Sequence, residues 1–121
     1  MIFQIESFST IRMSVSDVTQ SKLWYKNLFD LDPIEDLENF VSFKIGATNF
    51  DIVLEDAKSP ISVGGSVGYW LIDDLNTLLD RVRHLGGKIY RGPLDVPEIQ
   101  RSIIQIQDPY GNIVGFEAPL K

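Results

Sequence analysis

The feature that most constrains the fold of this chain is an order of local patterns that occurs once in each half of the sequence. Residues 9–15 alternate between apolar and polar side chains, and Asp17 then leads into apolar residues at helical spacing. Residues 67–72 read as another strand, and Asp74 again precedes a helical pattern. Asp17 and Asp74 therefore hold equivalent places, which predicts two similar units in one chain.

Each unit is completed by short strands after its helix. The apolar stripes that predict the helices are Val18, Ser21, Trp24, Tyr25, Leu28 and Phe29, and then Leu75, Leu78, Leu79, Val82 and Leu85. Further strands are expected at 39–44, 49–55, 88–91 and 101–107, with Gly92-Pro93 as a turn. We predict an α+β fold in which two βαβββ modules form a curled mixed sheet around a cleft. The expected division of this single domain is module one at about 9–56, a linker at about 57–66 and module two at about 67–118.

Composition limits the partners of the chain. Its 121 residues suit one domain of ordinary size, and the absence of cysteine excludes disulfides and thiolate chemistry. A net charge of −6 argues against nucleic acid and suits a cationic or neutral ligand. The sequence shows neither a basic leader nor a long apolar run, so we expect a cytoplasmic protein without a membrane partner.

The stretch from 106 to 119 predicts a closing hairpin. Alternating residues are interrupted by Asp108-Pro109-Tyr110-Gly111-Asn112, whose residue types favour a tight turn, and alternation then resumes. This segment resembles the last hairpin of the vicinal oxygen chelate superfamily, which includes glyoxalase I, extradiol dioxygenases and the bleomycin-resistance proteins. The resemblance extends from about residue 10 to residue 117. It implies the same paired-module fold and, for a chain of this length, a homodimer.

The resemblance also implies three positions for metal ligands. In the family, the first ligand is a His seven residues before the aspartate that starts helix one, the second unit has an equivalent position, and a metal-binding Glu follows the Asp-Pro-x-Gly-Asn turn after two apolar residues. These positions fall here on Thr10, Val67 and Gly115, and none of the three supplies an imidazole or a carboxylate. The single histidine, His84, lies near the end of the second helix, where a surface position is expected. We therefore expect no metal and no other cofactor.

Several residues on the inward strand faces could still contact a ligand. The set predicted to bind a small organic molecule is Arg12, Asp51, Glu55, Tyr69, Gln105 and Glu117. Two alternatives remain open: the carboxylates of Asp51, Glu55 and Glu117 could form a displaced metal site, or they could be solvated charges. Likewise, Arg12 could bind a ligand anion, or it could pair with Asp51 or Glu55.

Three kinds of function follow from these observations. The favoured one is a metal-free protein that sequesters a small organic ligand in a dimeric cleft, as the resemblance to bleomycin-resistance proteins implies. The second is a lyase, isomerase or dioxygenase-like enzyme with a relocated metal, and the third is a homodimer without a ligand. The missing ligands at Thr10, Val67 and Gly115 favour binding over catalysis.

Overall fold

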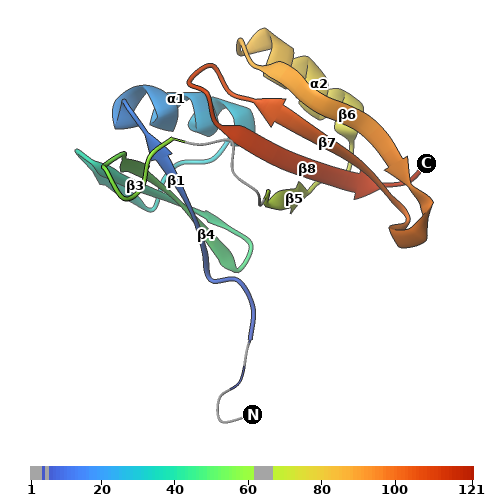
Figure 1. Ribbon diagram of the computed structural model, residues 1–121, viewed down its shortest axis with the longest axis horizontal. Coiled ribbons are helices and arrows are strands. Elements are labelled where there is room, and N and C mark those ends of the chain that lie inside the picture. The colour runs from blue at the N-terminus through green and yellow to red at the C-terminus, as the bar shows by residue number, and fades with distance from the viewer. Residues whose placement is uncertain (1–3, 5, 62–66) are drawn as a thin grey trace.

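The computed structural model describes residues 4, 6–61 and 67–121 (Figure 1). Each half of the chain has the order strand, helix, three strands, so the predicted α+β fold with two βαβββ modules is confirmed. Module one contains β1 (Thr10–Val15), α1 (Val18–Phe29), β2 (Glu35–Leu37), β3 (Phe40–Ile45) and β4 (Thr48–Leu54). Module two contains β5 (Tyr69–Leu71), α2 (Leu75–His84), β6 (Lys88–Val96), the short 3-10 helix η1 (Pro97–Ile99), β7 (Arg101–Gln107) and β8 (Ile113–Pro119).

The two modules form two separate four-stranded sheets with the same plan. The strand orders are β1-β4-β3-β2 and β5-β8-β7-β6, and only the first pair in each sheet is parallel. Figure 1 shows both helices on the same side of the molecule. None of the helices in the described part of the chain combines the length and the apolar character needed to cross a bilayer.

Local sequence signals explain both helices. The Asp17 carboxylate accepts a hydrogen bond from the backbone N–H of Gln20 at 3.0 Å, and Asp74 accepts one from Asn76 at 2.9 Å. These caps satisfy N–H groups that have no partner within the helix, so the predicted helix starts are confirmed. His84 ends α2 as an exposed residue of its last turn, as predicted.

Aromatic side chains join the two modules into one core. Tyr25 of α1 packs edge-on against Phe50 of β4, with ring centres 5.1 Å apart. Phe29 reaches across to module two, where it contacts Trp70 at 6.2 Å and Phe116 at 6.4 Å. Such pairs bury large apolar areas and add about 0.5–1.5 kcal/mol each beyond that burial. The apolar stripe that predicted α1 therefore lies in the core.

The hairpin turn after β7 also fastens module two to module one. Its first residue, Asp108, is buried and accepts a hydrogen bond from the Tyr25 hydroxyl at 2.7 Å. Its last residue, Asn112, donates from Nδ2 to the backbone oxygen of Ser14 at 3.1 Å. Gly111 adopts φ 99°, a left-handed conformation that glycine reaches without strain. The turn motif thus acts as a clasp between the modules.

Two details of the expected organisation need correction. β2 was not predicted, because its three residues are exposed and carry no apolar alternation. The strand predicted at 88–91 continues to Val96 through Gly92-Pro93, where a turn was expected. It can continue because β6 is an edge strand, and shifts in its register with β7 accommodate both residues. Residues 62–66 of the expected linker lie outside the described residues.

Candidate functional site

The face of each sheet that points away from the helices is called here its open face. On the open face of the first sheet, Arg12, Asp51 and Ser42 lie side by side on β1, β4 and β3. Arg12 Nη2 lies 3.0 Å from Asp51 Oδ2, so Arg12 pairs with Asp51 rather than with Glu55. The Arg12 side chain is 60% exposed, whereas that of Asp51 is only 6% exposed. The guanidinium carbon also lies 6.0 Å from the centre of the Phe40 ring, within cation–π range.

On the open face of the second sheet, Tyr69 and Gln105 form a hydrogen-bonded pair. Gln105 Nε2 donates to the Tyr69 hydroxyl at 2.8 Å. The two side chains border a cavity of about 220 Å³ whose other walls come from β6 and β7. Its lining consists of Tyr69, Arg91, Gly92, Leu94, Ile103, Ile104 and Gln105. The cavity therefore combines an aromatic ring and branched aliphatic side chains with one amide and one guanidinium.

The Tyr69 ring also decides what position 115 can hold. Gly115 lies beside Tyr69 in the register of β5 and β8. A Cβ atom on residue 115 would lie 2.6 Å from the Gly68 carbonyl oxygen and 2.6 Å from a ring carbon of Tyr69. Real Cβ atoms do not approach other heavy atoms so closely, so the backbone and the ring together exclude a side chain here. The glutamate that the resemblance places at this position has no room.

The other positions do not fit a divalent metal either. Thr10 and Val67 carry no imidazole or carboxylate, and the described residues contain no group of three His, Cys, Asp or Glu side chains that could hold an ion. The carboxylates considered for a displaced site make separate contacts. Asp51 pairs with Arg12, Glu117 lies 3.8 Å from Arg101, and Glu55 accepts from the backbone N–H of Ile61 at 3.3 Å. Among the described residues, the three carboxylates are therefore not brought together into one group, and the displaced metal site stays an untested alternative.

The six residues predicted to bind a ligand thus divide among four places. Arg12 and Asp51 share the first sheet, Tyr69 and Gln105 share the second, and Glu117 and Glu55 each stand in contacts of their own. Their role in ligand binding stays a prediction.

Some lining residues escaped the sequence reasoning. Arg91 and Leu94 line the Tyr69 cavity; Leu94 was missed because the strand was expected to end at residue 91, and Arg91 was placed in that strand but not on its inward face. Ser42 was missed although it lies between two buried apolar neighbours, Val41 and Phe43, which is the alternation of a strand with one open face.

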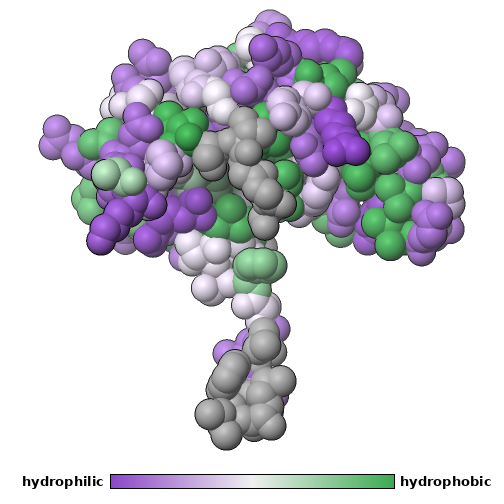
Figure 2. All heavy atoms as spheres, viewed as in Figure 1, coloured by the Kyte–Doolittle hydropathy of each residue, from purple (hydrophilic) through white to green (hydrophobic). Residues whose placement is uncertain are grey.

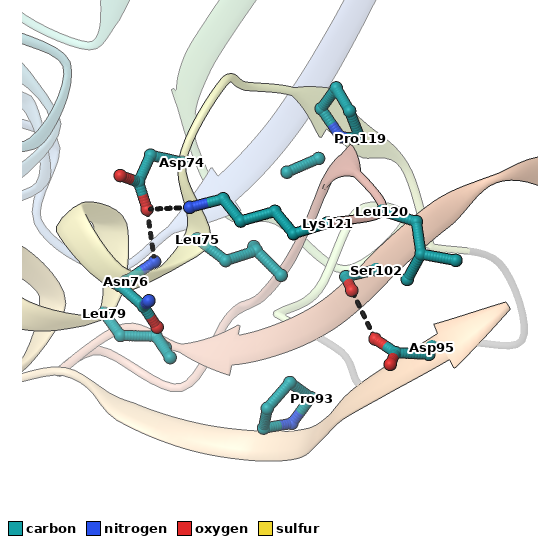
Figure 3. Close-up of a pocket in the computed structure, with 11 residues that line it drawn as sticks. Asp74, Leu75, Asn76, Leu79, Pro93, Asp95, Ser102, Pro119, Leu120 and Lys121 are labelled. Carbon is teal, nitrogen blue, oxygen red and sulfur yellow. Dashed lines mark hydrogen bonds and ion pairs between the residues drawn. The ribbon is translucent and has the colours of Figure 1, made fainter.

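A second cavity, of about 240 Å³, opens beside the start of α2 (Figure 3). Leu75, Leu79 and Ala118 contribute apolar surface. Its polar groups have partners: Lys121 Nζ lies 3.7 Å from Asp74, and the Ser102 hydroxyl donates to Asp95. Asp74 is also the α2 cap, and the hydrogen bond from the Thr77 backbone lowers the pKa of its carboxyl. Asp74 at the edge of this cavity thus has a structural role as the cap of α2.

A family model described as Glyoxalase/Bleomycin resistance protein/Dioxygenase superfamily matches residues 7–116. The chain belongs to this superfamily, and the resemblance drawn from its closing hairpin is confirmed. No curated protein sequence matches the chain.

Solved structures show the same fold at low sequence identity. TnmS3, described as an antibiotic binding protein from a Streptomyces species, is 22% identical with a TM-score of 0.77, covering 97% of this chain and 98% of its own. A superfamily enzyme from Burkholderia phytofirmans is 15% identical with a TM-score of 0.78, covering 93% of this chain and 98% of its own. Lactoylglutathione lyase from Agrobacterium tumefaciens is 19% identical with a TM-score of 0.71, covering 94% of each chain. These similarities establish the fold and nothing finer.

Proposed function

We propose that this protein binds a small organic ligand without a metal, on the open face of the second sheet. The observation that carries the proposal is the Tyr69 ring, which lies against Gly115 where the superfamily's metal-binding glutamate belongs. The same ring and its partner Gln105 form one side of the 220 Å³ cavity. Tyr69 fills the space of the metal-binding side chain and also lines a cavity. It therefore favours ligand binding over metal-dependent chemistry.

The walls of this cavity suit a flat, largely apolar molecule. Tyr69 offers a ring for stacking, and Leu94 and Ile103 offer aliphatic surface. Gln105 and Arg91 provide polar groups that fix orientation, which is the usual division of labour in ligand sites. The fold neighbour TnmS3, described as antibiotic binding, supports a binding role for such an architecture.

A homodimer is the second part of the proposal. Ligand pockets usually enclose about 300–1,000 Å³, so the cavity of one chain holds only part of a typical ligand. Large apolar side chains are exposed: Leu37 is 62% and Leu71 60% exposed at open-face positions, and Phe8, which precedes β1, is 80% exposed. Figure 2 shows further apolar surface at the right-hand end of the molecule, over the ends of the second sheet. A second copy packed against the open faces covers this surface and enlarges the cavity.

Ligand screening tests the binding proposal. Compounds that raise the melting temperature are found in a thermal-shift screen, and their affinities are measured by calorimetry for the wild type, Tyr69→Ala and Gln105→Leu. We expect Tyr69→Ala to weaken binding by at least about tenfold, since aromatic anchors contribute more than rim residues. Tyr90→Ala is the matched control, because Tyr90 is 49% exposed and does not line the cavity. Unchanged affinity in both cavity variants contradicts the proposal.

Elemental analysis tests the metal-dependent alternative. Protein purified without chelator is expected to contain far less than one equivalent of Ni, Zn, Fe or Mn per chain. One equivalent that survives dialysis contradicts the proposal and favours a lyase or dioxygenase-like enzyme. If the protein contains no metal and no compound stabilises it, these results favour the third possibility, a homodimer without a ligand.

A further inference from the structure

The open face of the first sheet contains a concentration of buried oxygen atoms without partners. Ser42 Oγ, Asn49 Oδ1 and Asp51 Oδ1 are inaccessible to solvent and accept no hydrogen bond from any described residue. Ser42 lies directly opposite Asp51 on β3 and β4, and Asn49 precedes Asp51 by two residues on the same face. Ser42 as a whole is 3% exposed and Asp51 4% exposed. The three atoms therefore belong to one patch, named here the acceptor patch.

This arrangement is unfavourable unless something donates to it. Each buried polar atom without a hydrogen bond costs about 1–3 kcal/mol, and a charged one costs more. Asp51 has its other oxygen in contact with Arg12, so only half of its carboxylate is satisfied. A sheet that needed only stability could place Thr or Val at such positions and avoid the cost. Because buried polar groups in native proteins are nearly always hydrogen-bonded, a set of unsatisfied acceptors points to a functional role.

The chemistry of the patch selects the kind of group that it can receive. Carboxylate and amide oxygens only accept hydrogen bonds, and a serine hydroxyl can accept as well. A group with several N–H donors matches a set of acceptors, and a positive charge is favoured beside the buried Asp51 carboxylate. An anionic group is attracted by Arg12, whose guanidinium is already paired, and by the exposed Lys44 opposite Asn49, but it is repelled by the Asp51 carboxylate at the centre of the patch. The net charge of the chain, −6, also attracts cations over anions.

We propose that Ser42, Asn49 and Asp51 form a subsite for a protonated primary amine or an amidinium group of the ligand. This inference rests on the proposed function, because it names a chemical group of the bound molecule. Asp51 supplies the negative charge, and the neutral oxygens of Asn49 and Ser42 accept the remaining N–H groups. The Phe40 ring, which lies beside Arg12 at the border of the patch, offers a face to the carbon attached to the amine.

The probe for this subsite is benzylamine, followed by two-dimensional NMR at pH 7 and constant ionic strength. Benzyl alcohol and benzoate serve as neutral and anionic probes of the same size. Benzylamine is expected to shift the backbone signals of Ser42, Asn49 and Asp51, whereas the other two probes leave them in place. Equal shifts with benzyl alcohol, or none with benzylamine, overturn the assignment.

Variants separate the patch from general electrostatics. Asp51→Asn is expected to weaken benzylamine binding by at least about tenfold, as the loss of a charged hydrogen-bond partner does. Glu38→Gln removes the same unit of charge from an exposed turn residue and is expected to change the affinity less than about twofold. Equal affinities in both variants contradict the role of Asp51.

Arg12→Met provides a test that poor folding cannot imitate. Removal of the guanidinium frees the second oxygen of Asp51, so benzylamine is expected to bind several-fold more tightly. The assignment is overturned in favour of an anion site if the wild type binds benzoate more tightly than this variant does and the variant shows no increase in benzylamine affinity. The proposed function is judged separately, by Tyr69→Ala and the screened compounds. A ligand that depends on Tyr69 but not on Asp51 therefore refutes only the amine subsite.

Discussion

The clasp between the modules yields a prediction whose size follows from its contacts. In Tyr25→Phe the ring keeps its packing against Phe50, but the hydroxyl that donates to Asp108 Oδ2 at 2.7 Å is lost. Both residues are buried, and the other carboxylate oxygen of Asp108 accepts from the N–H groups of Tyr110 and Asn112. The deleted bond leaves half of a buried carboxylate unsatisfied. We expect the free energy of unfolding to fall by about 1.5–3 kcal/mol.

Urea denaturation at pH 7, followed by far-ultraviolet circular dichroism, measures this loss of stability. Tyr90→Phe removes the same atom from a side chain that is 49% exposed, and it is expected to change stability by less than about 0.5 kcal/mol. A Tyr25→Phe protein as stable as this control refutes the clasp.

The pH dependence of the same variant gives an independent check. Burial and the neighbouring Asp108 carboxylate raise the pKa of Tyr25 well above its usual 10.0. The folded state therefore keeps this proton at a pH where the unfolded chain releases it. The resulting stability is complete below about pH 10 and declines above it, by up to about 1.4 kcal/mol per pH unit. Because phenylalanine has no such proton, the difference between wild type and Tyr25→Phe is expected to shrink from pH 9 to pH 11. A constant difference contradicts the argument.

Other variants test the remaining structural claims. Gly115→Ala places a Cβ 2.6 Å from the Gly68 oxygen, so thermal unfolding should show a loss of about 1–3 kcal/mol in the free energy of unfolding. An unchanged free energy of unfolding shows instead that Tyr69 and the backbone move to make room for the Cβ. Leu71→Lys places a charge on the exposed face proposed for the dimer, so light scattering should report a smaller mass than for the wild type. A wild-type protein that is monomeric at micromolar concentrations contradicts the dimer proposal. Glu117→Gln breaks a half-exposed pair with Arg101, so melting should change little while ligand affinity falls; unchanged affinity removes Glu117 from the site.

Local patterns in the sequence determined the repeated architecture. Alternation predicted β1, and the carboxylates of Asp17 and Asp74 marked both helix starts, because capping depends on residues only two or three positions away. The hairpin turn at 108–112 was predicted on the same kind of local evidence. These features were confirmed because each depends on residues that lie only a few positions apart in the sequence.

The tertiary structure decided the character of the candidate site. Asp51 alternates with buried residues and was expected on an inward face, but only the packing of three strands shows that one of its oxygens is buried without a partner. Gly115 was recognised as the wrong residue for a metal ligand, yet the reason lies in the Tyr69 ring, contributed by a strand distant in the sequence. Periodicity assigns a residue to a face of a sheet, whereas the neighbours across the sheet determine what space and which partners remain beside it.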